Sequence, residues 1–177
     1  MSTTLQRVLW LLGAVLILGG VNLSIAGHER TLNEGRVVLL DLAPRDPRSL
    51  MQGDYMALRF AIARPVGEAA QKAEMSHGQA VLRLDTNGVG QFVRLNRGEG
   101  GNSPLKGDEQ LLEFRLRGNE TRIVTNAYFF KEGSGKEFER ARYGQFRVNA
   151  DGTALLAALL DDKRQVIVGV APVVPAR

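Results

Sequence analysis

The sequence contains no cysteine in its 177 residues. This absence excludes disulfide bonds, cysteine-ligated zinc, iron–sulfur clusters and thiol catalysis. Aromatic residues make up 6% of the chain, so a hydrophobic core must be built chiefly from Leu, Val, Ile and Ala. The two histidines, His28 and His77, have no second histidine or carboxylate at metal-ligand spacing. We therefore expect neither a metal site nor a bound cofactor.

The excess of positive charge is small. The chain has 23 Lys and Arg residues against 19 Asp and Glu residues, a formal net charge of +4. Basic residues are interleaved with acidic ones, as where Arg115 and Arg117 lie near Glu113 and Glu120. No aromatic pattern of an RNA-binding sheet accompanies them. We therefore predict a mixed, solvated surface and no nucleic-acid partner.

One hydrophobic run is long enough to cross a membrane. Residues 8–26, which read VLWLLGAVLILGGVNLSIA, contain no charge. As a helix this run spans about 28 Å, close to the roughly 30 Å of a hydrocarbon core. A buried core helix is one alternative. A cleaved signal peptide is another, since Ser24 and Ala26 form a small-x-small site. We favour a transmembrane anchor that follows a short tail, residues 1–7.

The pattern beyond this run supports an anchor that is not cleaved. Asn22, Ile25, Glu29 and Leu32 continue at helical spacing, and Gly35 is a natural stop. The helix is therefore expected to continue to about residue 34.

The charges that flank the anchor bear on its orientation. The N-terminal side carries Arg7, whereas Arg30, Arg36, Arg45 and Arg48 follow the anchor. Counting these charges alone would keep the following domain in the cytoplasm, yet long C-terminal domains translocate largely regardless of them. We expect a single-pass protein whose C-terminal domain is extracytoplasmic.

Asn22 is the one amide within the anchor. In lipid such a group seeks a partner, and Gly13, Gly19 and Gly20 would let a second helix come close. This indicates a membrane-protein partner. The alternative is that Asn22 lies near the interface and is hydrated.

Residues 36–177 are sufficient for one compact domain. Three turn signals lie between strand-like runs: Asp85-Thr86-Asn87-Gly88, Gly118-Asn119-Glu120 and Asn149-Ala150-Asp151-Gly152. The runs that they join as hairpins are Ala80–Leu84 with Val89–Leu95, Gln110–Arg117 with Arg122–Phe130, and Phe146–Val148 with Ala154–Leu160. Further strands are predicted at Arg36–Leu42, Tyr55–Ala63 and Gln165–Val170, and short helices at Val66–Met75 and Lys136–Tyr143.

These elements predict a mainly β domain. Many short strands with tight hairpins and few helices favour an antiparallel sandwich or small barrel with one or two short helices. The alternative is an α+β fold in which one helix packs on a sheet.

One segment, residues 43–60, combines a long turn with a strand and reads APRDPRSLMQGDYMALRF. Gly53 allows a positive φ before the strand. Alternation along the strand then places Met56, Leu58, Phe60 and Ile62 toward the core, and Tyr55, Ala57, Arg59 and Ala61 toward the outside. Tyr55 is thus expected to present its hydroxyl to a partner.

Within this segment, Gly53-Asp54-Tyr55-Met56-Ala57-Leu58-Arg59-Phe60 resembles the motif that names the GDYXXLXY family of bacterial proteins. Gly53, Asp54, Tyr55 and Leu58 match that motif, and Phe60 replaces its final tyrosine. The resemblance implies a membrane-anchored protein whose context includes polytopic membrane proteins. It implies no particular activity.

Two functions are consistent with these residues. The first is an accessory or interaction protein that presents the Asp46–Tyr55 loop to a polytopic membrane protein or an extracytoplasmic ligand. The binding candidates are Asp46, Arg48, Ser49, Gly53, Asp54, Tyr55 and Leu58. The second is an anchored envelope hydrolase with Ser49 as nucleophile and Lys72 as base, or with a carboxylate near Asp54. A purely structural interpretation also stays open, in which Gly53 and Asp54 shape the turn and Asp46 pairs with Arg48.

Overall fold

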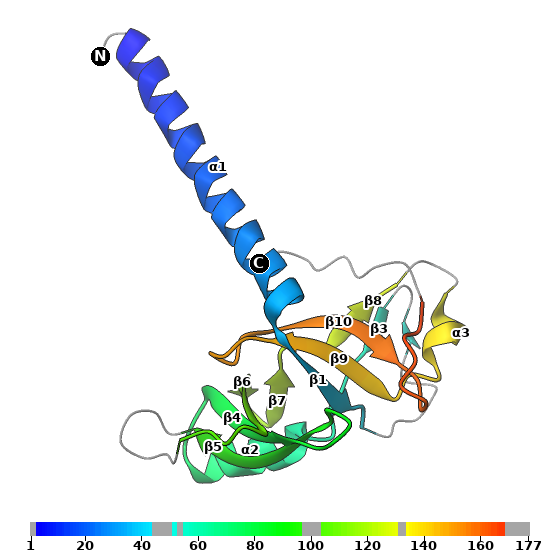
Figure 1. Ribbon diagram of the computed structural model, residues 1–177. Coiled ribbons are helices and arrows are strands. Elements are labelled where there is room, and N and C mark those ends of the chain that lie inside the picture. The colour runs from blue at the N-terminus through cyan, green and yellow to red at the C-terminus, as the bar shows by residue number, and fades with distance from the viewer. Residues whose placement is uncertain (1–2, 44–50, 53–54, 97–103, 131–133, 169–177) are drawn as a thin grey trace.

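The computed structural model describes residues 3–43, 51–52, 55–96, 104–130 and 134–168 (Figure 1). A long helix, α1 (Thr3–Glu34), leads into a head, residues 36–168, that consists mainly of short strands. The predicted mainly β fold with antiparallel sheets and few helices is confirmed.

The described strands form three antiparallel sheets. The first has the order β1-β9-β10 and contains Arg36–Asp41, Tyr143–Val148 and Ala154–Leu160. The second has the order β5-β4-β6-β7 and contains Gly90–Asn96, His77–Leu84, Glu109–Arg117 and Glu120–Ile123. The third has the order β2-β3-β8 and contains Met51–Gln52, Tyr55–Ala57 and Ala127–Phe129. Isolated bridges connect Leu39 with Val89 and Leu42 with Phe60.

The three predicted hairpins are confirmed as β4–β5, β6–β7 and β9–β10. In the first turn, Asp85 Oδ1 accepts hydrogen bonds from Asn87 N at 2.8 Å and Val89 N at 2.9 Å. Gly88 completes the turn with a φ of 79°, a conformation that glycine adopts without steric cost. The chemistry of this turn therefore favours the observed register of β4 against β5.

The predicted strand Arg122–Phe130 is wrong in its length. It ends as β7 at Ile123, because Val124 adopts a left-handed φ of 54° that no regular strand accommodates. The chain resumes as β8 in a different sheet. The predicted strand Gln165–Val170 is reduced, over its described residues, to one bridge between Val166 and Leu160.

The helices are also displaced from their predicted bounds. α2 spans Ala63–Lys72 rather than Val66–Met75, and it therefore replaces the end of the predicted strand Tyr55–Ala63. Pro65 lies in its first turn, where the missing N–H leaves no helical hydrogen bond unmade. α3 is the single turn Gly135–Phe138, because the remainder of the predicted helix Lys136–Tyr143 runs into β9.

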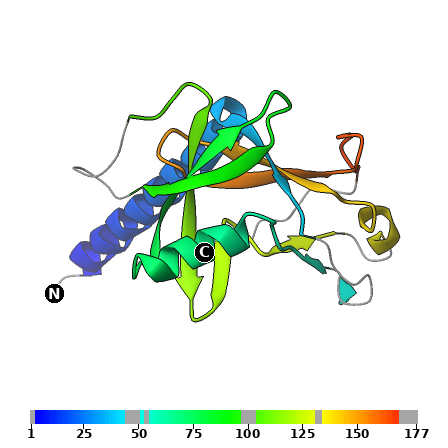
Figure 2. The same ribbon diagram turned by 90° about the horizontal axis from the view of Figure 1, so that it is seen from below.

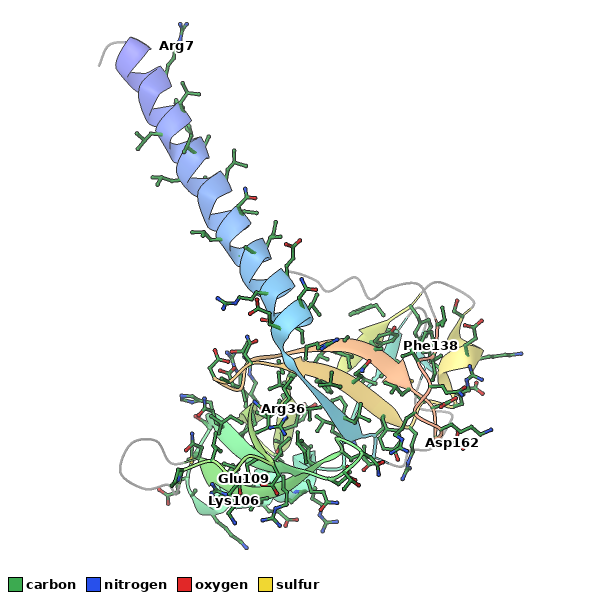
Figure 3. The ribbon with its side chains drawn as sticks, in the orientation of Figure 1. Arg7, Arg36, Lys106, Glu109, Phe138 and Asp162 are labelled. Atoms are coloured by element: carbon green, nitrogen blue, oxygen red, sulfur yellow. The ribbon has the colours of Figure 1, made fainter. Side chains whose placement is uncertain are left out.

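The elements are stacked away from α1. The sheet β1-β9-β10 lies between α1 and the four-stranded sheet, and α2 lies on the far side of the head (Figure 1). Seen from below, α2 is in front of the strands (Figure 2). Aromatic pairs contribute to the core: the Phe60 and Phe146 rings meet edge to face at 5.3 Å, and Phe138 stacks on Phe130 at 5.2 Å (Figure 3).

The hydrophobic part of α1, residues 8–26, has no polar face and projects away from the head (Figure 1). Its segment Trp10–Glu34 is long and apolar enough to cross a membrane, and none of the apolar stretch is buried against the protein. Leu16 and Leu23 are 68% and 78% exposed. This exposure excludes a core helix, because a core helix would bury such side chains.

The last turn of α1 is bonded to the head at a junction of four residues, Thr31, Gly35, Arg147 and Asn149, called the joint below. Asn149 Nδ2 donates to the buried Thr31 Oγ1 at 2.9 Å, and that hydroxyl donates to Gly27 O at 3.0 Å. The Arg147 guanidinium donates to Gly35 O at 3.2 Å, and Gly35 N donates to Thr31 O at 2.9 Å. The helix end and the β9–β10 hairpin therefore move together.

Gly35 is required at the joint by close packing. A Cβ atom at this position would overlap Thr31 O and would lie 3.0 Å from Val148 N. Both neighbours are backbone atoms, which cannot rotate away. We predict that Gly35→Ala destabilises the head by about 1–3 kcal/mol and increases protease cleavage between α1 and β1. Thermal melting and limited proteolysis measure both effects.

The control is Gly107→Ala, because no atom lies within 4 Å of a Cβ added at Gly107. Equal melting temperatures and cleavage rates for the two variants would show that the joint tolerates a side chain.

A buried carboxylate joins β5 to β6 within the four-stranded sheet, and the backbone beside it is hydrogen-bonded to β1. Glu109, whose side chain is 1% exposed, accepts a fork of hydrogen bonds from Arg94 at 2.8 and 3.0 Å. Lys106 N donates to the same carboxylate at 3.2 Å (Figure 3). Arg36 at the start of β1 donates to the backbone oxygens of Glu109 and Gly107. The side-chain hydrogen bonds from Arg94 are the main reason why the pKa of Glu109 is lowered from 4.5 to about 2.

This lowered pKa makes the stability of the head depend on pH. A carboxylate with a lowered pKa stabilises the fold above its unfolded pKa, and the contribution is lost as the pH falls from about 4.5 toward about 2. We predict that Glu109→Gln has a lower melting temperature than wild type at pH 7. The difference between the two melting temperatures should narrow as the pH falls from about 4.5 toward about 2. Melting temperatures across the pH range test this, with the exposed Glu113→Gln on the same strand expected to follow wild type. A difference that persists unchanged at the acid end would contradict it.

Candidate functional site

The motif segment lies partly within the described residues. The candidates Asp46, Arg48, Ser49, Gly53 and Asp54 fall outside them. Tyr55 and Leu58 are described and occupy the two faces that alternation predicts.

Tyr55 lies on the outer face of β3 and is half-buried. Its ring centroid is 5.8 Å from that of Phe129 on β8, which is 43% exposed. Leu58 is 3% exposed and belongs to the core, as do Met56, Phe60 and Ile62. A partner can thus reach Tyr55 and the exposed Arg59, whereas Leu58 holds the strand on the core.

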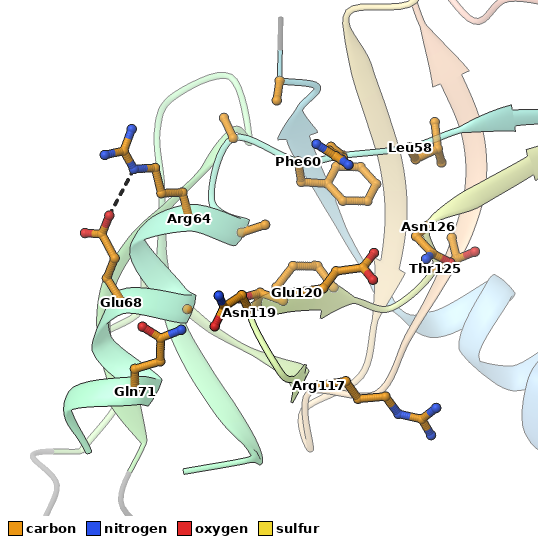
Figure 4. A pocket seen from close by; sticks show the side chains of 17 residues that line it. Leu58, Phe60, Arg64, Glu68, Gln71, Arg117, Asn119, Glu120, Thr125 and Asn126 are labelled. Atoms are coloured by element: carbon orange, nitrogen blue, oxygen red, sulfur yellow. Dashed lines mark hydrogen bonds and ion pairs between the residues drawn. The ribbon is translucent and has the colours of Figure 1, made fainter. Parts of the chain in front are cut away.

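The last residues of the motif and Ala61 form one wall of a groove of about 930 Å³ (Figure 4). Residues 58–61 contribute this wall, and α2 contributes a second with Arg64, Glu68 and Gln71. The β6–β7 hairpin lines a third side with Asn119, Glu120 and neighbouring residues. Three segments that are distant in sequence therefore meet directly beside the motif.

The groove has an apolar base and a polar rim. Leu58, Phe60 and Ile123 are each at most 3% exposed and supply apolar surface. Exposed Arg59 has no ion-pair partner among the described residues. Arg64 Nε, by contrast, donates to Glu68 Oε1 at 2.9 Å in an exposed pair that adds little stability (Figure 4). An apolar base with a few polar groups around it is typical of a binding site.

Close packing holds the hairpin against α2. A Cβ atom added at Gly67 on α2 would overlap the hydroxyl of Thr121 on β7. The absence of a side chain at Gly67 thus leaves room for the Thr121 hydroxyl at that end of the groove.

The hydrolase alternative receives no support from the described residues. Ser49 is outside them, and Lys72 lies exposed in the last turn of α2. Among the described side chains, no group of three or more histidines, aspartates or glutamates is placed to hold a metal ion.

The anchor amide is bonded within its own helix. Asn22 Nδ2 donates to Leu18 O at 3.0 Å. This intrahelical bond lowers the need of Asn22 for a partner in another helix, so the amide is a weaker indication of a membrane partner than its sequence position implies.

The match to a family model described as GDYXXLXY protein covers residues 17–159. The chain belongs to the GDYXXLXY family. In this GDYXXLXY protein the match begins inside α1 and ends within β10, so it includes the joint, the motif and every wall of the groove. Comparison with curated proteins and with solved structures gives no match.

Proposed function

We propose that this GDYXXLXY protein is a membrane-anchored interaction protein without catalytic activity. α1 anchors it in a bacterial inner membrane, and the head lies on the periplasmic side. The head binds a polytopic membrane protein, or an extracytoplasmic ligand, through the Asp46–Tyr55 loop and the groove next to it. The observation that carries this proposal is that the last residues of the motif form a wall of the groove.

The anchor supports a membrane setting for that partner. Eight residues separate Ala26, the end of the uncharged run, from Gly35. At 1.5 Å per residue this helical extension places the head about 12 Å beyond the hydrocarbon core. The joint prevents the head from swinging freely, so the groove faces a defined direction relative to the bilayer. A partner in the same membrane would then encounter the groove in a limited range of orientations.

The edge of β7 supports an extended segment as the bound element. Leu116 N donates to Ser76 O at 2.7 Å, so Leu116 and its partner Thr121 form a pair without mutual backbone bonds. In an antiparallel ladder the backbone groups of Thr121 then point away from β6. Since Thr121 lines the groove, an extended partner segment can pair with this edge by strand addition.

We predict that a photo-crosslinking amino acid at Asn119, on the exposed turn beside the groove, captures an integral membrane protein in intact membranes. The same group at exposed Lys163, remote from the groove lining, serves as the control. Arg59→Ala should reduce the captured product without lowering the melting temperature, because Arg59 is exposed. Asp54→Ala should also reduce the captured product, since the Asp46–Tyr55 loop is proposed to bind the partner. Equal capture from both positions, or capture that neither variant affects, would overturn the proposal.

The predicted topology has a separate test. A reporter that is active only outside the cytoplasm, fused after Arg177, should be active, since the head is proposed to be periplasmic. A cytoplasm-dependent reporter at the same position is the matched control and should be silent. The reverse result would refute the proposed localisation while leaving the groove unaffected.

A further inference from the structure

The outer face of the β6–β7 hairpin brings like charges together. Arg115 on β6 lies directly opposite Arg122 on β7, and Arg117 follows two residues later on the same face as Arg115. All three residues are exposed. Like charges placed opposite each other in an antiparallel pair destabilise it, so this arrangement does not serve the stability of the hairpin.

Four other described arginines of the head have a carboxylate partner, which these three lack. Arg64, Arg83, Arg94 and Arg142 each face a carboxylate at 3.8 Å or less. Within the described residues, Arg115, Arg117 and Arg122 have no ion-pair partner and no side-chain hydrogen bond. Two carboxylates, Glu113 and Glu120, share the face, yet neither comes within ion-pair distance of them.

A hollow lies beside this face. It has a volume of about 270 Å³ and is lined by the three arginines together with Glu113, Phe114, Val124, Thr153 and Ala154. Three positive charges and one negative charge therefore border a space that is smaller than a typical site for a drug-sized ligand. In Figure 4 the Arg117 side chain points away from α2, which is consistent with its position at the boundary between the groove and this hollow.

We propose that the hollow is a binding site for a phosphate-class oxyanion, held by Arg115, Arg117 and Arg122. A guanidinium group presents parallel N–H donors that match two oxygens of a phosphate at once. An anion placed between Arg115 and Arg122 removes their mutual repulsion and supplies the counter-charge that the fold does not. The site is distinct from the motif wall of the groove and does not depend on the proposed partner.

The location of the hollow relative to the anchor identifies two possible sources of the phosphate. Thr153 and Ala154 follow the β9–β10 turn, in which Asn149 donates to Thr31 of α1. The hollow is thus connected, through the β9–β10 turn, to the end of α1 that is proposed to leave the bilayer. The ligand is therefore either the phosphate of an anionic lipid headgroup or that of a soluble phosphate compound, and the chemistry at the arginines is the same.

The test uses the full chain in nanodiscs. The melting temperature of the head is measured by thermal proteolysis. In phosphatidylcholine discs, sodium phosphate is compared with sodium chloride at equal ionic strength. We expect phosphate to raise the melting temperature by about 2–4 °C for wild type and by nothing measurable for the double variant Arg115→Gln/Arg122→Gln. In a second arm without free phosphate, phosphatidylglycerol discs produce the same rise if the source is lipid, and no rise if it is soluble.

A matched control removes two exposed charges elsewhere, through Arg140→Gln/Lys163→Gln, and should respond like wild type. In low-salt chloride the Arg115→Gln/Arg122→Gln variant should itself melt about 1–3 °C above wild type, since the repulsion is gone. This readout also shows that the variant is folded. The proposal is overturned if neither phosphate nor phosphatidylglycerol stabilises wild type, or if either stabilises the arginine variant equally.

Discussion

The position of every surface of the head depends on the joint. α1 is a rod of 32 residues, and at its end Gly35 lets the backbone of β9 approach more closely than any side chain would permit. The hydrogen bond from Asn149 to Thr31 then closes this contact from the hairpin side. Because the contact consists of backbone packing and buried hydrogen bonds, it holds the head in one orientation rather than on a flexible tether.

That contact extends beyond the first sheet. Gln110 on β6 donates to Asn149 O at 2.8 Å. β6, which carries Arg115 and Arg117, is therefore bonded to the residue that donates to Thr31 of α1. At Gly67, α2 packs closely against Thr121 on the adjacent β7. The groove and the hollow are consequently built on one hairpin whose position is coupled to the anchor. A ligand at either site acts on a rigid support, which favours recognition over large conformational change.

The accuracy of the sequence analysis follows from whether the chemistry is local. Each of the three hairpin turns has a glycine at positive φ, and in the turn Asp85–Gly88 a side chain also bonds the local backbone, so all three hairpins could be predicted. The break at Val124 was not, because nothing in a β-branched residue signals a left-handed φ. α2 shows the intermediate case: its composition indicates a helix, but the helix begins and ends three residues earlier than composition predicts, at Ala63 and Lys72.

The candidate sites show the same division. Alternation correctly placed Tyr55 outside and Leu58 inside, yet the groove beside them also requires α2 and the β6–β7 hairpin, which no local pattern connects with the motif. The outer face of the β6–β7 hairpin is a second example of a site that only the three-dimensional structure shows. In the sequence, Arg115, Arg117 and Arg122 are interleaved with acidic residues and predict a neutralised surface. Only the register, which sets Arg115 against Arg122 rather than against Glu120, reveals a local excess of positive charge. Pairing across strands, and not composition, therefore decides where this protein attracts an anion.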